Sequence, residues 1–531
     1  MSLFFPSMRK RVQAVWSQTL WVQVALSLAI FGLALAVRLP NLMMVPAYTD
    51  ESREVLWGLD IALGRHFPLT GIDSYDGPLF AYLVAGLFHL LGVSAEIPRE
   101  MALICGALTV VAVYWLGRLM LNRWAGLIAA GLAMGCPQFV IYTSHPGWSS
   151  SLSPFFVMAT AVALYAGVER DKPWLLASSG LLAALTLQSH PTSLTSLIGM
   201  LLWFLTRPTL RQSLGRPAPY IALGLFLIGY SPMILANVGF GAPVLSDAVH
   251  RTYAFVPTLD PLEYLRRLTD LVRIAGFYVG GGIGDGTTTM RVVASIMLIL
   301  LLIGFVVAWR RQNRLIPSIF FAALFLLPFL VVSPSYRYSP YFIPMSYVVL
   351  GILAEGAIRF LWNKRGDTGV FRILRRPALA FCVIILVGFA AYSLYNLFTF
   401  YQDAFADGMT NEDYFRLVED VKNNGACGSN LFVEKPAAST YESPDGGFSP
   451  FAYNNVDFVL TMSSCAHTTL NPGVILQKLS NEGQSGWLIA PANYIQDNGE
   501  ALNLWPISTI HPVVFATITP ISLYRVQAVR R

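Results

Sequence analysis

LWVQVALSLAIFGLALAV, at residues 20–37, is the stretch that decides the class of fold. It carries no charge, is long enough to cross a bilayer as one helix, and follows the basic cluster Arg9–Lys10–Arg11. No small-residue cleavage site follows it, so we expect a retained first transmembrane helix rather than a cleaved signal peptide. The whole chain agrees, because apolar residues make up 55% of it and charged residues only 12%, against roughly a quarter in soluble proteins.

Further apolar runs predict about eleven membrane spans. They lie near residues 20–37, 100–117, 124–142, 152–168, 174–188, 191–206, 218–236, 292–309, 315–333, 340–361 and 378–398. Basic clusters follow every second span, so the positive-inside rule places the N-terminus in the cytoplasm and the C-terminal region outside. We therefore predict a multi-pass protein of the cell inner or plasma membrane. The same clusters account for the net charge of +6, which does not indicate nucleic-acid binding.

The first outer loop, residues 38–98, is predicted to lie against the membrane surface. Residues 78–91 are apolar but too short to span, and a true span there would place the next basic clusters outside. Residues 53–67 carry apolar side chains on one helical face. We therefore expect two surface-lying helices in this loop.

From about residue 399 the polar residues return, and the pattern predicts a small extracytoplasmic α/β domain over 399–531, distinct from a membrane domain over 1–398. Expected helices are 411–424 and 471–483; expected strands are 430–435, 456–462, 486–492 and 515–527. Outside the cell, Cys427 and Cys465 could form a disulfide, although spacing alone does not fix the pairing. The other three cysteines lie in apolar segments and are expected to be small buried residues.

Asp50 and Glu51 stand about a dozen residues after the first span, near the membrane surface. A carboxylate in this place can deprotonate a hydroxyl that attacks a lipid-borne electrophile. Asp76 follows in the same loop, just before the apolar segment 78–91. Taken alone, the acidic pair is also explained as a solvated feature of a polar loop.

The surrounding residues make the pattern more specific. The series Arg38-x-Pro40, Asp50-Glu51, Ala62-x-Gly64, Pro68, Tyr75-x-Gly77-Pro78 and Tyr82 resembles the first loop of GT-C membrane glycosyltransferases. It is most similar to the branch with the protein O-mannosyltransferases and the lipid A aminoarabinose transferases, of the glycosyltransferase family 39 type. The resemblance covers roughly residues 10–400 and is strongest in 38–170. It implies a GT-C fold, a polyprenyl-phosphate-linked sugar donor, inversion at the anomeric carbon, and Asp50 as the catalytic residue.

The second outer loop departs from that family pattern. Many relatives carry an acidic residue directly before a proline here, whereas this chain has Ser153 before Pro154. A divalent cation is the candidate cofactor, and Asp50, Asp76 and His145 are the obvious candidate ligands. The lost carboxylate puts that metal in doubt. A lone histidine such as His145 is more often a structural residue, but it could also supplement the site.

Four further positions are candidates for the substrate cavity or the donor phosphate. Arg337, in SPSYRYSPYFIP, is similar to an arginine that faces the donor phosphate in GT-C enzymes, with Tyr338 beside it; the alternative is an arginine that reaches lipid headgroups. His190 interrupts an apolar region, as a cavity wall or as a simple helix break at Pro191. Tyr82, with Asp76, His145 and His190, completes the predicted cavity.

The sequence therefore predicts a hexosyl- or pentosyltransferase with a polyprenyl-phosphate-linked donor and a protein, lipid or glycan acceptor. Asp50 is the expected general base, with Glu51 supporting it. One alternative is a non-catalytic membrane subunit on the same scaffold, which the loss at Ser153 keeps open. The other is a protein that binds or flips a lipid-linked sugar, which predicts charges within the spans and repeat symmetry that the sequence does not show.

Overall fold

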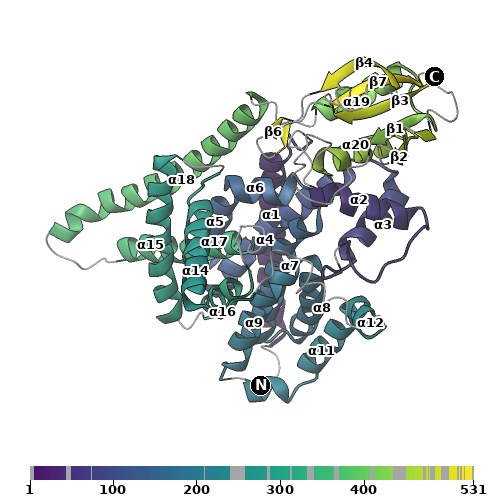
Figure 1. Cartoon of the computed structure of the whole chain (residues 1–531). Coiled ribbons are helices and arrows are strands. Elements are labelled where there is room, and N and C mark those ends of the chain that lie inside the picture. The colour runs from purple at the N-terminus through teal and green to yellow at the C-terminus, as the bar shows by residue number, and fades with distance from the viewer. Residues whose placement is uncertain are drawn as a thin grey trace. The chain divides into compact units, whose positions relative to one another are not determined.

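A computed structural model of the chain describes residues 5–43, 49–72, 74–208, 210–239, 257–283, 287–310, 314–331, 340–363, 370–406, 412–434, 450–470, 474–475, 477–478, 485–491, 502–510, 513–514, 517–518 and 521–528. Most of these residues are helical (Figure 1). Contacts divide the chain into two compact units: unit 1 holds residues 1–40, 103–144 and 150–397, and unit 2 holds residues 41–102, 145–149 and 398–531.

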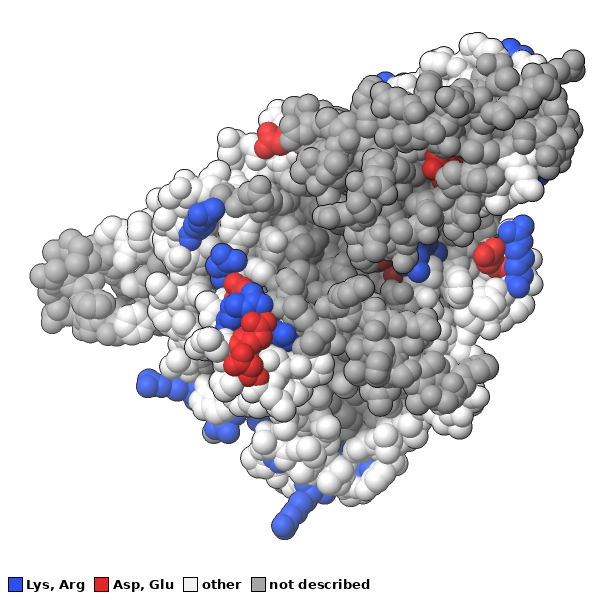
Figure 2. Space-filling view, viewed as in Figure 1, with Lys and Arg blue, Asp and Glu red and all other residues white. Residues whose placement is uncertain are grey.

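Six described helices contain a segment long and apolar enough to cross a membrane. They are α1 (Phe5–Arg38), α4 (Ile97–Met120), α7 (Ser149–Glu169), α15 (Thr288–Arg310), α17 (Phe342–Asn363) and α18 (Val370–Ala406). Two bent pairs raise the number to eight if each pair is one span: α5 (Arg123–Met134) with α6 (Pro137–Ser144), and α11 (Ala218–Gly229) with α12 (Ser231–Gly239). Charged side chains are sparse on the described surface in Figure 2, as expected for a fold embedded in lipid.

Shorter helices account for the remaining predicted spans. These are α8 (Pro173–Ser189), η1 (Pro191–Ser193) with α9 (Leu194–Leu205), and α16 (Leu315–Leu330). Along the chain, α10 (Leu210–Leu214) comes between α9 and α11, and α14 (Pro261–Val279) comes between α12 and α15. Proline marks the breaks, with Pro137 at the 74° bend, Pro232 at the 57° bend and Pro191 between α8 and α9. Proline has no backbone N–H for the helical hydrogen bond, so the helix ends or bends there.

In unit 1, neighbouring helices approach each other closely at glycine residues. A Cβ atom at Gly351 of α17 would come within 2.6 Å of the carbonyl oxygen of Ala125 in α5, and Gly199 of α9 lies equally tightly against Ile319 of α16. Small residues at helix contacts let helices pack closely in lipid, where the hydrophobic effect does not drive them together.

Unit 2 combines the two helices of the first loop, α2 (Thr49–Ala62) and α3 (Leu79–Leu91), with the C-terminal region. That region holds α19 (Glu412–Asn423), α20 (Pro450–Met462) and a five-stranded sheet. The strand order is β2 (Thr468–Leu470), β1 (Leu431–Glu434), β3 (Ser485–Pro491), β7 (Ile521–Ala528), β4 (Leu502–Ile510). The first three strands are parallel, and β7 runs antiparallel to β3 and β4. A separate pair joins β5 (Val513–Val514) to β6 (Thr517–Ile518).

The interior of the sheet explains why this region folds. Phe432, Leu488, Tyr524 and Val526 are buried on one face of the sheet together with Ile475. Alternate residues of each strand face this core, which is the period-two pattern expected of strands. Figure 1 shows α19 and α20 beside this sheet.

One predicted element is wrong. Residues 456–462 (VDFVLTM) are not a strand but the second half of helix α20. Val456, Val459 and Leu460 are buried there at the three- and four-residue spacing of a helix. A short apolar run buried on several sides has no clear period, so sequence alone did not distinguish strand from helix. The predicted helix at 471–483 falls largely outside the described residues.

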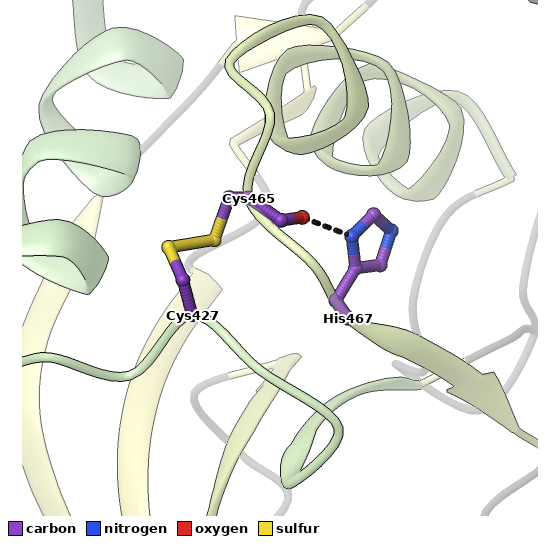
Figure 3. Close-up of a disulfide and its surroundings, with 3 residues drawn as sticks. All are labelled: Cys427, Cys465 and His467. Carbon is purple, nitrogen blue, oxygen red and sulfur yellow. Dashed lines mark hydrogen bonds between the residues drawn. A yellow bond between two sulfur atoms is a disulfide. The ribbon is translucent and has the colours of Figure 1, made fainter.

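The two units divide the chain differently from the expected boundary at 398/399, because the first loop belongs to the same unit as the C-terminal region. That expected boundary stays a prediction. Within unit 2, Cys427 and Cys465 form a disulfide with their Cα atoms 5.0 Å apart (Figure 3). It joins the chain just after α19 to the end of α20.

Candidate functional site

The predicted acidic pair lies in the first turn of α2. This helix begins at Thr49, four residues earlier than expected, so Asp50 and Glu51 are helical residues rather than loop residues. Acidic side chains in a first turn stabilise a helix, because the free N–H groups and the helix dipole give that end a partial positive charge. The side chain of Asp50 is half-buried.

Glu51 is fully engaged by a buried arginine. Its Oε1 accepts from Nε of Arg99 at 2.7 Å, and its Oε2 accepts from the terminal NH2 nitrogen of Arg99 at 3.0 Å. Oε1 also accepts from the backbone N–H of Gly147 at 2.8 Å. A second guanidinium nitrogen of Arg99 donates to the carbonyl of Leu42 at 2.9 Å. Such a bidentate pair fixes both side chains, so Glu51 holds the first turn of α2 against the start of α4.

Position 147 has room only for a glycine. A Cβ atom at Gly147 would lie within 3 Å of Pro98 and of the backbone nitrogen of Arg99. The 145–149 segment therefore rests directly on the start of α4, and its N–H reaches the carboxylate of Glu51 from there.

One turn after Glu51, a second glutamate holds the same segment. Glu54 accepts from the backbone N–H of Ser149 at 2.7 Å and from its hydroxyl at 3.0 Å. Ser149 opens α7, so Glu54 satisfies an N–H group that has no partner within its own helix. Glu51 and Glu54 are both buried and together fix the 145–149 segment to α2.

Ser52 makes the third contact of this helical face. Its hydroxyl donates to Oδ1 of Asn455 in α20 at 2.8 Å, and both side chains are buried. Three side chains in the first two turns of α2 thus bond to three distant parts of unit 2, while Asp50 lies beside them.

The other two candidate residues of the first loop, Asp76 and Tyr82, take part in hydrogen bonds that hold the conformation of the loop. The backbone N–H of Gly71 donates to the carbonyl of Asp76 at 2.7 Å and closes a turn, and the side chain of Asp76 is buried. The hydroxyl of Tyr82 donates to the carbonyl of Pro68 at 3.1 Å, which ties the loop to α3. Burial raises the pKa of the Tyr82 hydroxyl. A cavity role for either residue stays a prediction.

His145 lies in unit 2 with Tyr401, near the end of α18. Its Nε2 is 2.9 Å from the Tyr401 hydroxyl, and the two rings are 5.5 Å apart. The imidazole is completely buried, so this contact provides a polar partner in an otherwise costly position. The structure brings together His145 and a tyrosine that sequence reasoning did not single out.

His190 and Ser153 lie in unit 1, and the side chain of each forms a hydrogen bond with another side chain. Nδ1 of His190 accepts from the backbone N–H of Thr192 and lies 2.6 Å from its hydroxyl, which caps the short helix η1. This geometry matches the helix-break interpretation at Pro191. Ser153 is fully buried, with its hydroxyl 2.7 Å from that of Ser193. The position where the family pattern predicted an acidic residue thus holds a hydroxyl that is hydrogen-bonded to another hydroxyl.

Arg337 and Tyr338 lie outside the described residues, so their predicted contact with the donor phosphate rests on sequence alone. Among the residues that the structure describes, no three His, Cys, Asp or Glu side chains converge as metal ligands. Asp50, Asp76 and His145 therefore do not form a three-ligand site in the described part of the chain. For this reason we route no chemical step through a metal.

Arg99, Glu54, Asn455 and Tyr401 are the residues that sequence reasoning missed. Two signals were available: Arg99 is a charge at the start of an apolar helix, where an unpaired charge is costly, and Glu54 lies one turn from Glu51 on the same helical face. Asn455 and Tyr401 carry no such signal, because their partners lie hundreds of residues away.

Comparison with known proteins places this arrangement in a family context. The family model for dolichyl-phosphate-mannose-protein mannosyltransferases matches residues 75–235. Two structures of ArnT from Cupriavidus metallidurans, bound to undecaprenyl phosphate and in the apo state, superpose with TM-scores of 0.59 and 0.60. Identity is 9%, over 95% and 96% of this chain and 98% of ArnT. The chain has the GT-C fold of the membrane glycosyltransferases.

A more distant structure agrees with the GT-C fold. The oligosaccharyltransferase of Archaeoglobus fulgidus in its apo form superposes with a TM-score of 0.50 at 14% identity, over 89% of this chain and 70% of that protein. No curated protein matches this chain. The fold class and the GT-C resemblance predicted from the first loop are confirmed.

Proposed function

We propose that this GT-C protein is a glycosyltransferase that moves a sugar from a polyprenyl-phosphate donor to an extracytoplasmic acceptor with inversion. The observation that supports the proposal is the different burial of the three carboxylates in the first two turns of α2. Glu51 and Glu54 are buried, whereas Asp50, in the first turn of the same helix, is half-buried and therefore more accessible to a substrate. Asp50 is thus the carboxylate of this group that suits proton transfer to and from a substrate.

In the proposed reaction Asp50 takes the proton from the acceptor hydroxyl or amine as that atom attacks the anomeric carbon. The new glycosidic bond forms while the bond from the anomeric carbon to the phosphate oxygen breaks. The polyprenyl phosphate leaves with that electron pair. Arg337, with Tyr338, is proposed to neutralise the leaving phosphate, because a guanidinium fork matches its geometry.

Glu51 acts in this proposal as a positioning residue. Its pair with Arg99 fixes the rotation of α2 and therefore the direction in which Asp50 points. The membrane helices would hold the polyprenyl chain, with the N-terminus in the cytoplasm and the C-terminal region outside. One comparison structure and the matched family model support the donor class, because ArnT was solved with undecaprenyl phosphate and the family model is named for dolichyl-phosphate-mannose.

The test is sugar transfer by the purified protein in lipid nanodiscs, with a panel of radiolabelled polyprenyl-phosphate sugars. The matched variants are Asp50→Asn and Asp60→Asn, which change the same residue type on the same helix; Asp60 forms only an exposed pair with Arg65. We expect transfer by the parent and by Asp60→Asn, and a loss of at least ~100-fold in Asp50→Asn. Full activity in Asp50→Asn would show that another group is the base.

The hydrogen bond between Ser153 and Ser193 supports a second candidate, a non-catalytic subunit that keeps the fold. Such a protein would transfer no sugar with any donor. Photolabelling by a polyprenyl-phosphate analogue separates two cases: labelling without transfer indicates a lipid-binding subunit, and transfer of any sugar excludes this candidate.

A further inference from the structure

The helix that carries Asp50 is joined to the C-terminal region by one buried hydrogen bond between side chains. The Ser52 hydroxyl donates to Oδ1 of Asn455 at 2.8 Å across 403 residues of sequence. The exposed fraction of Ser52 is 0% and that of Asn455 is 3%, so water does not compete for this bond. A serine in a helix commonly bonds to its own backbone; here its hydroxyl reaches another helix instead.

Asn455 lies at a junction of three helices of unit 2. It belongs to α20, bonds to Ser52 of α2, and lies close to Tyr414 of α19. Burial raises the pKa of the Tyr414 hydroxyl, and the nearby Asn455 side chain opposes part of that effect. Within this unit, the first loop and the C-terminal region form one compact body.

The C-terminal half of α20 is itself held in place by a disulfide and a histidine. The disulfide between Cys427 and Cys465 holds the residues after its last turn, and His467 bonds to the carbonyl of Cys465 at 2.9 Å (Figure 3). His467 also bonds to Asp457 of α20 at 2.8 Å. A helix held in this way provides a rigid support for the side chain of Asn455. Supporting contacts of this kind are what keep a reacting group within the narrow geometry that catalysis needs.

We propose that Asn455 is a positioning residue for Asp50, so that the C-terminal region completes the catalytic site. This inference rests on the proposed function of Asp50. Ser52 is two residues after Asp50 in the same helical turn, so a shift of Ser52 moves Asp50 as well. The C-terminal region then has a second task besides any contact with the acceptor: it sets the direction of the base.

Two variants test the coupling against a matched control. Asn455→Ala removes the acceptor of the bond, and Ser52→Ala removes its donor. Thr461→Ala changes a half-buried polar residue of the same helix α20 that makes no side-chain hydrogen bond among the described contacts. Melting temperature and an intact disulfide are checked in all three, because a loosened C-terminal region alone could lower activity.

Transfer kinetics separate positioning from binding. We expect Asn455→Ala to lower kcat by roughly ten- to a hundredfold, since a displacement of about 1 Å can cost that much, while the KM for the lipid donor changes less than about twofold. The double variant Ser52→Ala with Asn455→Ala should be no slower than the slower single variant, because both remove one bond. Additive losses, or an equal loss in Thr461→Ala, would overturn the proposal.

Hydrogen–deuterium exchange gives a readout that needs no substrate. In Asn455→Ala we expect faster exchange in the first turns of α2 and unchanged exchange in α3, which serves as the internal reference. Unchanged exchange in α2 would overturn the coupling even if the parent enzyme is active. If the parent transfers no sugar, the proposed function fails, and faster exchange in α2 would still establish the link between Asn455 and this helix.

Discussion

Arg99 holds Glu51 by two hydrogen bonds, of 2.7 and 3.0 Å, and both side chains are at most 3% exposed. The pair joins the start of α4 to the first turn of α2, and Gly147 adds a third bond to the same carboxylate. A buried carboxylate needs such partners, because water is not available to solvate its charge.

The variant Arg99→Met should therefore destabilise unit 2 strongly. Removal of one partner leaves the other as a buried, unpaired charge, which typically costs about 3–5 kcal/mol. The measurement is thermal unfolding in detergent. Arg65→Met is the control from the same loop, because the Arg65–Asp60 pair is 67% and 44% exposed and its loss should cost no more than about 1 kcal/mol. Equal melting temperatures for the two variants would contradict the assigned burial of the pair.

His467 should make the stability of the C-terminal region depend on pH. Burial lowers its pKa, but the hydrogen bonds to Asp457 and to the Cys465 carbonyl raise it by more, so the folded pKa lies above the ordinary 6.5. The protonated ring donates to both acceptors. Its stabilising effect is therefore fully present below about pH 6.5 and is lost as pH rises through the folded pKa.

We expect the melting temperature to fall over that window, as measured by differential scanning fluorimetry from pH 5.5 to 8.5. In His467→Gln this component of the pH dependence should disappear. If the slope persists in the variant, another titrating group is responsible.

The disulfide should stabilise the C-terminal region by about 4 kcal/mol, because it closes a loop across a separation of 38 residues. The double variant Cys427→Ser with Cys465→Ser should melt earlier and should no longer respond to reductant. Cys105, Cys136 and Cys382 are free thiols, so the parent should release one additional pair of thiols on reduction. Thiol counting before and after reduction checks this expectation, and an unchanged count would refute the pairing.

Gly351 should tolerate no larger side chain. In Gly351→Val a Cβ atom would meet the carbonyl of Ala125, and forcing such an overlap in a packed core typically costs about 1–3 kcal/mol. Gly388 of α18 has no atom within 4 Å of a Cβ position, so Gly388→Val is the matched control. Size-exclusion profiles after heating compare the two, and we expect a loss of the monodisperse peak at lower temperature only for Gly351→Val.

Much of the membrane fold was predictable, because span length and basic clusters are properties of the chain alone. Segments such as 20–37 and 292–309 are helices as expected. The strand predicted at 456–462 failed because an apolar run buried by long-range packing has no readable period. A helix in this part of the first loop was predicted, but its start at Thr49 was not, and this start changes the acidic pair from loop to helix.

The site was predictable only in part. Asp50 and Glu51 are marked by residue type and by resemblance, but the different environments of the two carboxylates depend on Arg99 and Gly147. Those partners are 48 and 96 residues away from Glu51, and no local pattern reports such a distance. The contact between His145 and Tyr401, across 256 residues, is hidden for the same reason.

The bond between Ser52 and Asn455 also has a consequence for how the protein is made. Ribosomes synthesise the chain from its N-terminus, so α2 emerges long before α20 exists. The contacts of its first turn can be completed only when residue 455, of 531, has been added and delivered to the same compartment. A nascent or truncated chain that ends before residue 455 therefore cannot form this contact, however well its membrane helices have already folded.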